Sequence, residues 1–255
     1  MTGPAVVIPT HARRDLLRAA VASCVDLPVV VVDDSPNGMG PLHGVTWLRT
    51  SGSTGFARAV NHGLDHLAQR GTRAALVLND DATLQAGCAQ RLWQVWTTRG
   101  GVVGPVVRRP DGTVQSAGFR LADWGRMKAR DSVPQGISSV DAVSGACLLM
   151  GTSWRFDPAY SHGMEDIELC RRVRRAGGSV VLVPDATCVH VGGATVATTS
   201  PEAQRKAVAG HLRLVGGGWR SGVVVGLALA QVVREAGGVT RARAVVQGWR
   251  DWRRG

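Results

Sequence analysis

Short apolar runs alternate with amphipathic segments along the first part of this chain. Three runs rich in valine or leucine cover residues 5–8, 29–32 and 74–78, and residues 15–24 and 56–69 repeat apolar positions at helical spacing. Runs that are apolar on both faces suit the buried strands of a parallel sheet, with helices covering each side. The pattern therefore predicts an α/β fold with a mostly parallel central sheet flanked by helices.

The pattern changes after a helix predicted at residues 86–98. Residues 101–107 and 113–119 flank the turn Arg109-Pro110-Asp111-Gly112, which is typical of a β-hairpin. Residues 120–140 are polar and irregular, and we expect a mobile loop there. The other elements expected in this half are an apolar run at 140–150, a helix at 165–176, and strands at 179–183 and 186–191.

Composition indicates a globular protein with a basic tail. The chain has 255 residues, 44% of them apolar, and its formal net charge is +11. Residues 201–255 hold ten of the thirty Lys and Arg against three acids, so a polyanion would be attracted mainly to the tail. A non-catalytic polyanion-binding protein would explain this charge, but no DNA or RNA recognition motif is present and no nucleic-acid partner is expected.

Cysteine usage and hydropathy bear on the compartment. The five cysteines lack CxxC spacing and lie in apolar or helical contexts, which indicates reduced thiols in a cytoplasmic protein. The amino terminus has no signal-peptide pattern. The longest apolar stretch, residues 223–233, is too short to cross a bilayer as a helix.

Carboxylates end two of the predicted strands, where α/β sheets bind ligands. Asp34 follows the run at 29–32 and could accept the imide N–H of a uracil or thymine ring, although an acid capping the turn is an equal alternative.

Asp80 and Asp81 follow the run at 74–78. Neighbouring carboxylates repel unless a cation neutralises them, and a divalent cation would bridge to a diphosphate; a solvated turn is the alternative. Successive side chains of a strand point to opposite faces, so only one of these two carboxylates need contact the metal. We assign Asp81 to the metal and Asp80 to the donor's sugar or ribose.

Further candidate site residues lie in the second half of the chain. Glu165 and Asp166 open a helix, where the helix dipole favours negative charge, so a cap competes with a proton-accepting role. His190 ends a short apolar run just before two glycines. A hydrogen-bonded surface histidine competes there with a metal ligand.

Seven segments, in order, resemble the family 2 glycosyltransferases, especially the rhamnosyltransferase-like branch with a GT-A fold. They are VVIPTHARRDLL at 6–17, VVVVDDS at 29–35, GSTGFARAVNHGL at 52–64, LVLNDDATL at 76–84, GPVVRRPDGTVQSAGF at 104–119, DAVSGACLLM at 141–150, and FDPAYSHGMEDIELCRRVRRAGGSVVLVPDATCVHVGG at 156–193. The resemblance covers about residues 5–215. Asp80 and Val60 depart from the family pattern, which leaves the base and ribose contacts open.

The resemblance implies a metal-dependent inverting transferase. It would move a sugar from a nucleoside-diphosphate donor, a dTDP- or UDP-sugar including deoxysugars such as rhamnose, to a hydroxyl of a natural product or saccharide. Asp166 would be the general base and Glu165 would orient the acceptor, while Asp81 and His190 would coordinate Mg²⁺ or Mn²⁺. The donor would be held by Pro9, Thr10 and Asp34 at the base, by Arg58 or Asn61 near the ribose or diphosphate, by Asp80, and by Ser144, Gly145 and Ala146 around the sugar.

The resemblance also implies a division of the chain. We expect a GT-A domain at residues 1–215, with a nucleotide-binding half at 1–100 and an acceptor half at 101–215, followed by a basic helical segment at 216–255. A nucleotidyltransferase of related fold is an alternative, but residues 9–20 lack the GxGxR pattern of its phosphate loop.

The tail has the pattern of a basic amphipathic helix. Its expected apolar face comprises Ala242, Val245, Val246, Trp249 and Trp252, and Arg241, Arg243, Arg250 and Arg254 lie mainly opposite. Such a face could lie on the anionic inner face of the membrane, near a lipid-linked acceptor, or pack on the catalytic domain or on a second subunit of a homodimer. The pattern leaves these alternatives open.

Overall fold

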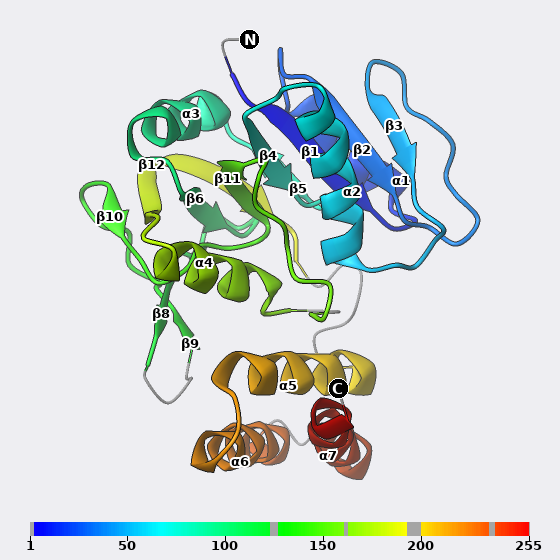
Figure 1. The fold of residues 1–255 in the computed structure, drawn as a ribbon, viewed down its shortest axis with the longest axis vertical. Helices are drawn as coiled ribbons and strands as arrows, with labels where there is room; N and C mark the ends of the chain where they lie inside the picture. Colours follow the sequence, from blue (N-terminus) through cyan, green and yellow to red (C-terminus); the bar gives the residue numbers. More distant parts are fainter. Residues whose placement is uncertain (1–2, 123–126, 161–162, 193–199, 235–237, 255) are drawn as a thin grey trace.

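The structure is a computed structural model that describes residues 3–122, 127–160, 163–192, 200–234 and 238–254. A mixed sheet forms the centre of the molecule, helices flank it, and three further helices gather at one end (Figure 1). This arrangement confirms the predicted α/β fold with a helical C-terminal part.

The main sheet brings several strand ends together. Its strands are β1 (Ala5–Thr10), β2 (Val29–Asp33), β3 (Thr46–Arg49), β4 (Ala74–Leu78), β5 (Ala82–Leu84), β6 (Val102–Arg108), β7 (Val114–Ser116), β10 (Ser138–Ser139), β11 (Cys147–Gly151) and β12 (Val180–His190). The order is β10-β12-β6-β11-β4-β1-β2-β3, with β5 beside β12 and β7 beside β6. Strands β4, β1, β2 and β3 run parallel, so their carboxyl ends meet at one edge, whereas β11 runs antiparallel between β4 and β6.

Each face of the sheet has its own apolar core because side chains alternate along the strands. The flanking helices are α1 (Arg14–Ala22), α2 (Phe56–Gln69), α3 (Cys88–Arg99) and α4 (Glu165–Arg175). On β1, Val7 packs in the core that contains residues of α2 and α4, whereas Val6 and Ile8 pack in the core that contains residues of α1 and α3. Helix α2 lies tightly on the sheet at Gly63, where a Cβ would come within 2.6 Å of a Val7 methyl group.

The second half of the chain differs from expectation in one segment. The predicted hairpin is present, since β6 pairs with β7 across the turn at 109–112. The irregular loop expected at 120–140 is wrong for the described residues: β8 (Phe119–Leu121) pairs with β9 (Met127–Ala129), and β10 joins the main sheet. Apolar side chains of this hairpin pack on the core between polar neighbours, in an alternation too short to stand out in the sequence.

Strand β12 replaces the two strands predicted at 179–183 and 186–191. It pairs in parallel with β6 along most of its length, and its register shifts between Val183 and Thr187. Pro184 lies within this shift, which explains why the sequence suggested an interruption. The continuous strand carries the chain from one end of the sheet to His190 at the other.

The C-terminal helices form a unit that also contacts the sheet domain. They are α5 (Pro201–Val215), α6 (Trp219–Arg234) and α7 (Gly238–Arg254), and they share an apolar cluster around Leu212, Val224 and Val245. Leu214 of α5 packs instead in the core of the sheet, and its carbonyl accepts a hydrogen bond from Arg171 of α4. Helix α5, which the sequence division assigned to residues 1–215, therefore contacts both parts.

The apolar face expected on the tail exists, but α5 and α6 cover it. Val245 is fully buried, and Ala242, Trp249 and Trp252 pack on the same cluster, while Val246 is 37% exposed. Of the alternatives that the sequence left open, the structure shows packing of this face within the chain. In the described ranges, no helix combines the length and apolarity that a bilayer span requires.

Candidate donor and catalytic site

Polar residues from β1, β2 and β4 meet where these parallel strands end. The Thr10 hydroxyl donates to Asp80 Oδ2 at 2.6 Å, and His11 Nδ1 lies 3.0 Å from the Asp34 carbonyl oxygen. Pro9 is buried within β1. The sheet thus brings Asp34 close to the Asp80-Asp81 pair, as expected for residues that follow neighbouring parallel strands.

Asp34 organises the loop that leads into α2. Its Oδ1 accepts hydrogen bonds from the hydroxyls of Thr50 and Thr54 and from the Thr54 N–H, and its Oδ2 accepts one from the Gly55 N–H at 2.9 Å. Burial would raise the pKa of Asp34, but these hydrogen bonds outweigh it and lower the pKa below its ordinary value. The turn that follows β2 is capped instead by Asp33, which accepts the N–H groups of Ser35 and Met39. Of the two Asp34 oxygens, Oδ2 accepts fewer hydrogen bonds and can accept another.

Helix α2 carries Arg58, which forms no ion pair with a described residue, and Asn61, whose side-chain amide is held by two hydrogen bonds. Asn61 Nδ2 donates to the Phe156 carbonyl at 2.8 Å, and Asn61 Oδ1 accepts from the Phe156 N–H at 2.9 Å. Arg58 is exposed on the first turn of the same helix. Of the two residues expected near the ribose or diphosphate, Arg58 has the freedom to reach an anion.

Asp80 turns toward β1. It is 6% exposed, and its Oδ2 accepts hydrogen bonds from Thr10 and, at 3.4 Å, from the His11 N–H. Burial, followed by the nearby Asp81 charge, raises the pKa of Asp80 despite the Thr10 hydrogen bond. These contacts hold Asp80 within the fold and leave Asp81 as the second carboxylate of the pair.

Asp81 and His190 meet across two paired strands. Strand β5 runs antiparallel to the end of β12, and the Val191 N–H donates to the Asp81 carbonyl at 3.0 Å. The His190 Nε2 then lies 3.0 Å from Asp81 Oδ1, and Nδ1 lies 3.2 Å from Gln115 Oε1. Burial opposes ionisation of Asp81, but the His190 contact and the nearby Arg13 charge lower its pKa, so the carboxylate is ionised at neutral pH.

The Asp81–His190 pair fits two ligands of a divalent cation. Two ligands at right angles, each about 2.1 Å from an octahedral cation, lie about 3.0 Å apart. In the tautomer in which Nδ1–H donates to Gln115 Oε1, the Nε2 lone pair would be available to a metal, and Asn79 Nδ2 lies 3.5 Å from Nε2. No cluster of three or more His, Cys, Asp or Glu suited to a metal occurs in the described part of the chain, so the other ligands would come from the donor and water.

Two buried polar atoms near this pair are without partners. Arg13 Nη1 and Asn79 Oδ1 make no hydrogen bond to any described residue. The Arg13 charge acts to lower the pKa of both Asp80 and Asp81, so Arg13 lies near both carboxylates. Sequence analysis missed Arg13, and also Gln115; the signal for Arg13 was a basic pair directly after the first strand end.

Asp166 opens α4 beside the loop at 144–146. Its Oδ2 accepts the Gly145 N–H at 2.7 Å, and its Oδ1 accepts the Ile167 N–H at 2.8 Å. A Cβ on Gly145 would lie 3.2 Å from the Asp166 Cβ, so glycine is what permits this approach. Two backbone donors stabilise the carboxylate, although burial, the larger effect, raises the Asp166 pKa.

Glu165 carries the proton of the acidic pair. Burial, followed by the Asp166 charge, raises the pKa of Glu165 to about 8. Its Oε2 is buried and has no hydrogen-bond partner among the residues placed in the structure. Two adjacent carboxylates cannot both ionise easily in such a site. The two N–H groups that donate to Asp166 favour the charge there, and Glu165, whose Oε2 has no partner among the described residues, is the better place for the proton.

The loop at 144–146 lies between the Asp81–His190 pair and Asp166. The Asn79 N–H donates to the Ala146 carbonyl at 3.0 Å, and Gly145 contacts Asp166 as described. Ser144 is partly exposed, and its Oγ accepts the Ala146 N–H at 3.3 Å. The stations from both halves of the sequence therefore belong to one continuous site.

Comparisons with known proteins show the family of this chain. A sequence model described as glycosyltransferase like family 2 matches residues 37–217. The chain belongs to this family. It is thus a glycosyltransferase that uses a nucleotide-sugar donor. Membership of this family argues against the alternative of a nucleotidyltransferase.

Two curated relatives bear the same name, N-acetylglucosaminyl-diphospho-decaprenol L-rhamnosyltransferase, and come from the CDC 1551 and H37Rv strains of Mycobacterium tuberculosis. Each is 24% identical over 220 residues, covering 71% of this chain and 71% of the relative. They support the predicted resemblance to the rhamnosyltransferase-like branch.

Solved structures share the fold. The mannosyltransferase PcManGT from Pyrobaculum calidifontis, in complex with GDP-Man and Mn²⁺, has a TM-score of 0.58 at 14% identity, over 97% of this chain and 86% of that one. GalNAc-T7 with UDP, GalNAc and Mn²⁺ also has a TM-score of 0.58, at 16% identity, over 74% of this chain and 43% of that one. These matches confirm the predicted GT-A fold.

Proposed function

We propose that this protein is a metal-dependent inverting glycosyltransferase that moves a sugar from a dTDP- or UDP-sugar to an acceptor hydroxyl. The observation that carries the proposal is the continuous site from the Asp81–His190 pair, through Asn79 and the loop at 144–146, to Asp166. A leaving diphosphate at one end and a base at the other are the two requirements of sugar transfer from such donors.

Asp166 is the proposed general base. Gly145 and Ile167 fix its carboxylate through their N–H groups, and the carboxylate takes the proton of the acceptor hydroxyl as the hydroxyl oxygen attacks the anomeric carbon. Glu165, protonated at neutral pH, can donate a hydrogen bond that orients the acceptor but cannot act as a nucleophile. A single ionised carboxylate on the acceptor side supports a direct displacement with inversion.

Asp81 and His190 are the proposed ligands of Mg²⁺ or Mn²⁺. A divalent cation bound there supplies charge stabilisation for the departing nucleoside diphosphate. Arg13 and Arg58 are the proposed phosphate contacts, supported by the unpartnered Nη1 of Arg13 among the described residues and by the exposure of Arg58. Asp34 Oδ2 and Pro9 are the proposed contacts of the nucleotide base. Both structural relatives hold Mn²⁺ together with a nucleotide or nucleotide sugar, which supports a metal in this family fold.

The acceptor and donor follow from the sequence relatives. Their names specify rhamnosyl transfer to a sugar linked by diphosphate to a polyprenol, so a deoxysugar donor such as dTDP-rhamnose and a lipid-linked saccharide acceptor are the first candidates here. We infer a cytoplasmic enzyme that works at the inner face of the membrane, and the basic C-terminal part supports this location.

A donor panel tests the proposal. The full chain is incubated with UDP-, dTDP- and GDP-sugars, with Mn²⁺ or with EDTA, and released nucleoside diphosphate is measured. We expect release from a dTDP- or UDP-sugar only with Mn²⁺, strong loss in Asp81→Ala, and no loss in the matched control Asp15→Asn, an exposed acid of α1. Equal release in EDTA, or release from none of the donors, would contradict the proposal.

A further inference from the structure

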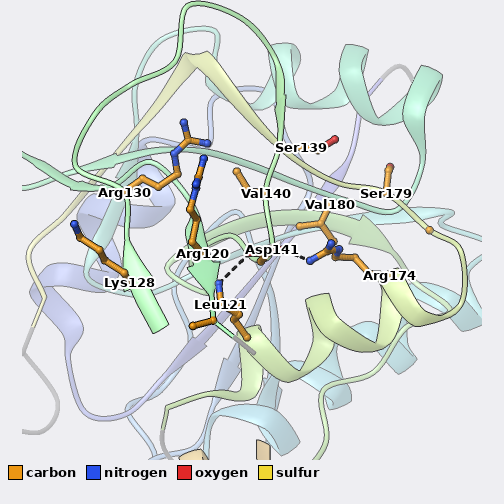
Figure 2. Close-up of a pocket in the computed structure, with 12 residues that line it drawn as sticks. Arg120, Leu121, Lys128, Arg130, Ser139, Val140, Asp141, Arg174, Ser179 and Val180 are labelled. Carbon is orange, nitrogen blue, oxygen red and sulfur yellow. Dashed lines mark hydrogen bonds and ion pairs between the residues drawn. The ribbon is translucent and has the colours of Figure 1, made fainter. Parts of the chain in front are cut away.

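A cavity lies at the carboxyl-terminal end of α4, away from Glu165 and Asp166 at the start of this helix. It has a volume of about 780 Å³ and opens between the β8–β9 hairpin, β10, and the region where α4 ends and β12 begins (Figure 2). Arg174 lines it, eight residues after Asp166 and so about 12 Å further along the helix axis. Val180 lines it at the start of β12, whose far end carries His190, so the cavity is distinct from the donor site.

Basic side chains dominate the wall of this cavity. Arg120, Lys128, Arg130 and Arg174 line it, and Asp141 is the acid among its lining residues. Each oxygen of the Asp141 carboxylate already has a partner: Oδ1 forms an ion pair with Arg174, and Oδ2 accepts a hydrogen bond from the Leu121 N–H at 2.9 Å (Figure 2).

The three cations of the hairpin have no such partner. Arg120, Lys128 and Arg130 form no hydrogen bond or ion pair with another side chain that the structure describes. Arg120 and Lys128 lie directly opposite each other on the antiparallel ladder of β8 and β9. Like charges in opposed positions are destabilising, and Arg130, two residues after Lys128, extends the charge on the same face. An anion between these side chains would remove the repulsion.

We propose that this cavity binds the phosphate or diphosphate group of a ligand. The guanidinium forks of Arg120 and Arg130 match phosphate oxygens in pairs, and the Lys128 ammonium adds a third charge. Two sources share this chemistry: free inorganic phosphate or pyrophosphate, and the diphosphate of a prenyl-linked saccharide. The inference stands on the hairpin and its cavity, and it does not depend on the metal, donor or base assigned above.

Calorimetric titration of the full chain with inorganic pyrophosphate in EDTA tests the proposal. We expect binding that is weakened roughly tenfold or more in Arg120→Gln/Lys128→Gln and clearly weakened in Arg130→Gln, since each removes a charged hydrogen bond. The matched control Arg18→Gln/Arg73→Gln removes the same charge from exposed positions on α1 and before β4, and should bind as the unaltered protein does. Thermal melting checks that each variant folds.

Two comparisons decide the outcome. Pyrophosphate binding that survives Arg13→Gln/Arg58→Gln but is lost in the hairpin variants places the anion in this cavity, whereas binding lost in Arg13→Gln/Arg58→Gln and kept in the hairpin variants overturns the proposal. Absence of binding, or equal weakening in the Arg18→Gln/Arg73→Gln control, overturns it as well. Repeating the titration with farnesyl diphosphate identifies the source: at least tenfold tighter binding than pyrophosphate indicates a prenyl-linked ligand, and equal binding indicates the free anion.

Discussion

Protonation of Glu165 makes the stability of this protein depend on pH in a way that one substitution should remove. Its pKa rises from the ordinary value of 4.5 to about 8 in the folded protein, mainly through burial and then through the Asp166 charge. The folded protein therefore holds this proton more tightly than the unfolded chain does. The stabilisation is complete below pH 4.5 and is lost as the pH rises toward 8. Glu165→Gln keeps the neutral shape and abolishes the titration.

The size of the effect follows from the pKa difference. Between the two pKa values, the free energy of unfolding falls by about 1.4 kcal/mol per pH unit for one such group. From pH 6 to pH 8 the decrease amounts to about 2 kcal/mol, after allowing for partial titration near pH 8. Water reaches part of the Glu165 side chain and screens its charge, so we expect a measured decrease of about 1 to 2 kcal/mol.

Urea denaturation at pH 6, 7 and 8 measures this decrease in the unaltered protein and in Glu165→Gln. The variant should lose the decrease and become the more stable protein at pH 8. Asp166→Asn is the matched control, because it retains the titrating Glu165 and should keep a pH-dependent, though smaller, decrease. A parallel pH dependence in the unaltered protein and in Glu165→Gln would refute the assignment of the proton to Glu165.

Three further outcomes are expected. Asp166→Asn should lower turnover by about a hundredfold or more while donor affinity, measured by calorimetry, stays nearly unchanged; near-normal turnover would make Asp166 a helix cap. Asp81→Ala should weaken Mn²⁺-dependent binding of nucleoside diphosphate more than His190→Ala does, and unchanged binding in both would remove the metal site. The full chain should co-sediment with anionic but not neutral vesicles, and Trp219→Ser/Leu227→Ser should reduce this, because these α6 side chains are 67% and 47% exposed; equal sedimentation with both vesicle types would exclude the membrane contact.

Sequence periodicity was sufficient for the part of the fold that is built from long, two-sided apolar runs. Helix α2 and strand β4 lie within two residues of their predicted bounds, because burial on both strand faces and one helical stripe leaves a strong pattern. The hairpin of β8 and β9 was missed because only alternate residues are apolar and each strand is three residues long. Its stability comes from packing on the core, which local sequence does not reveal.

The candidate site was predictable by residue type but not by contact. Asp81 and His190 are more than a hundred positions apart, and only the pairing of β5 with the end of β12 places them 3.0 Å from each other. Asn61 and Asp34 show the opposite case. The sequence suggested a ligand contact for each. In the structure the Asn61 amide hydrogen-bonds to the Phe156 backbone, and the Asp34 carboxylate accepts hydrogen bonds from the loop before α2.

The antiparallel strand β11 explains why the Asp81–His190 pair and Asp166 lie at the same edge of the sheet. Because β11 runs between β4 and β6 in the reverse direction, the turn that precedes it, at 144–146, lies beside the carboxyl end of β4. That turn receives the Asn79 N–H on one side and donates the Gly145 N–H to Asp166 on the other. A fully parallel sheet would place this turn at the opposite edge, about 17 Å away for a five-residue strand. The reversed direction of β11 is therefore the feature that brings Asp166 to the edge of the sheet where β4 ends.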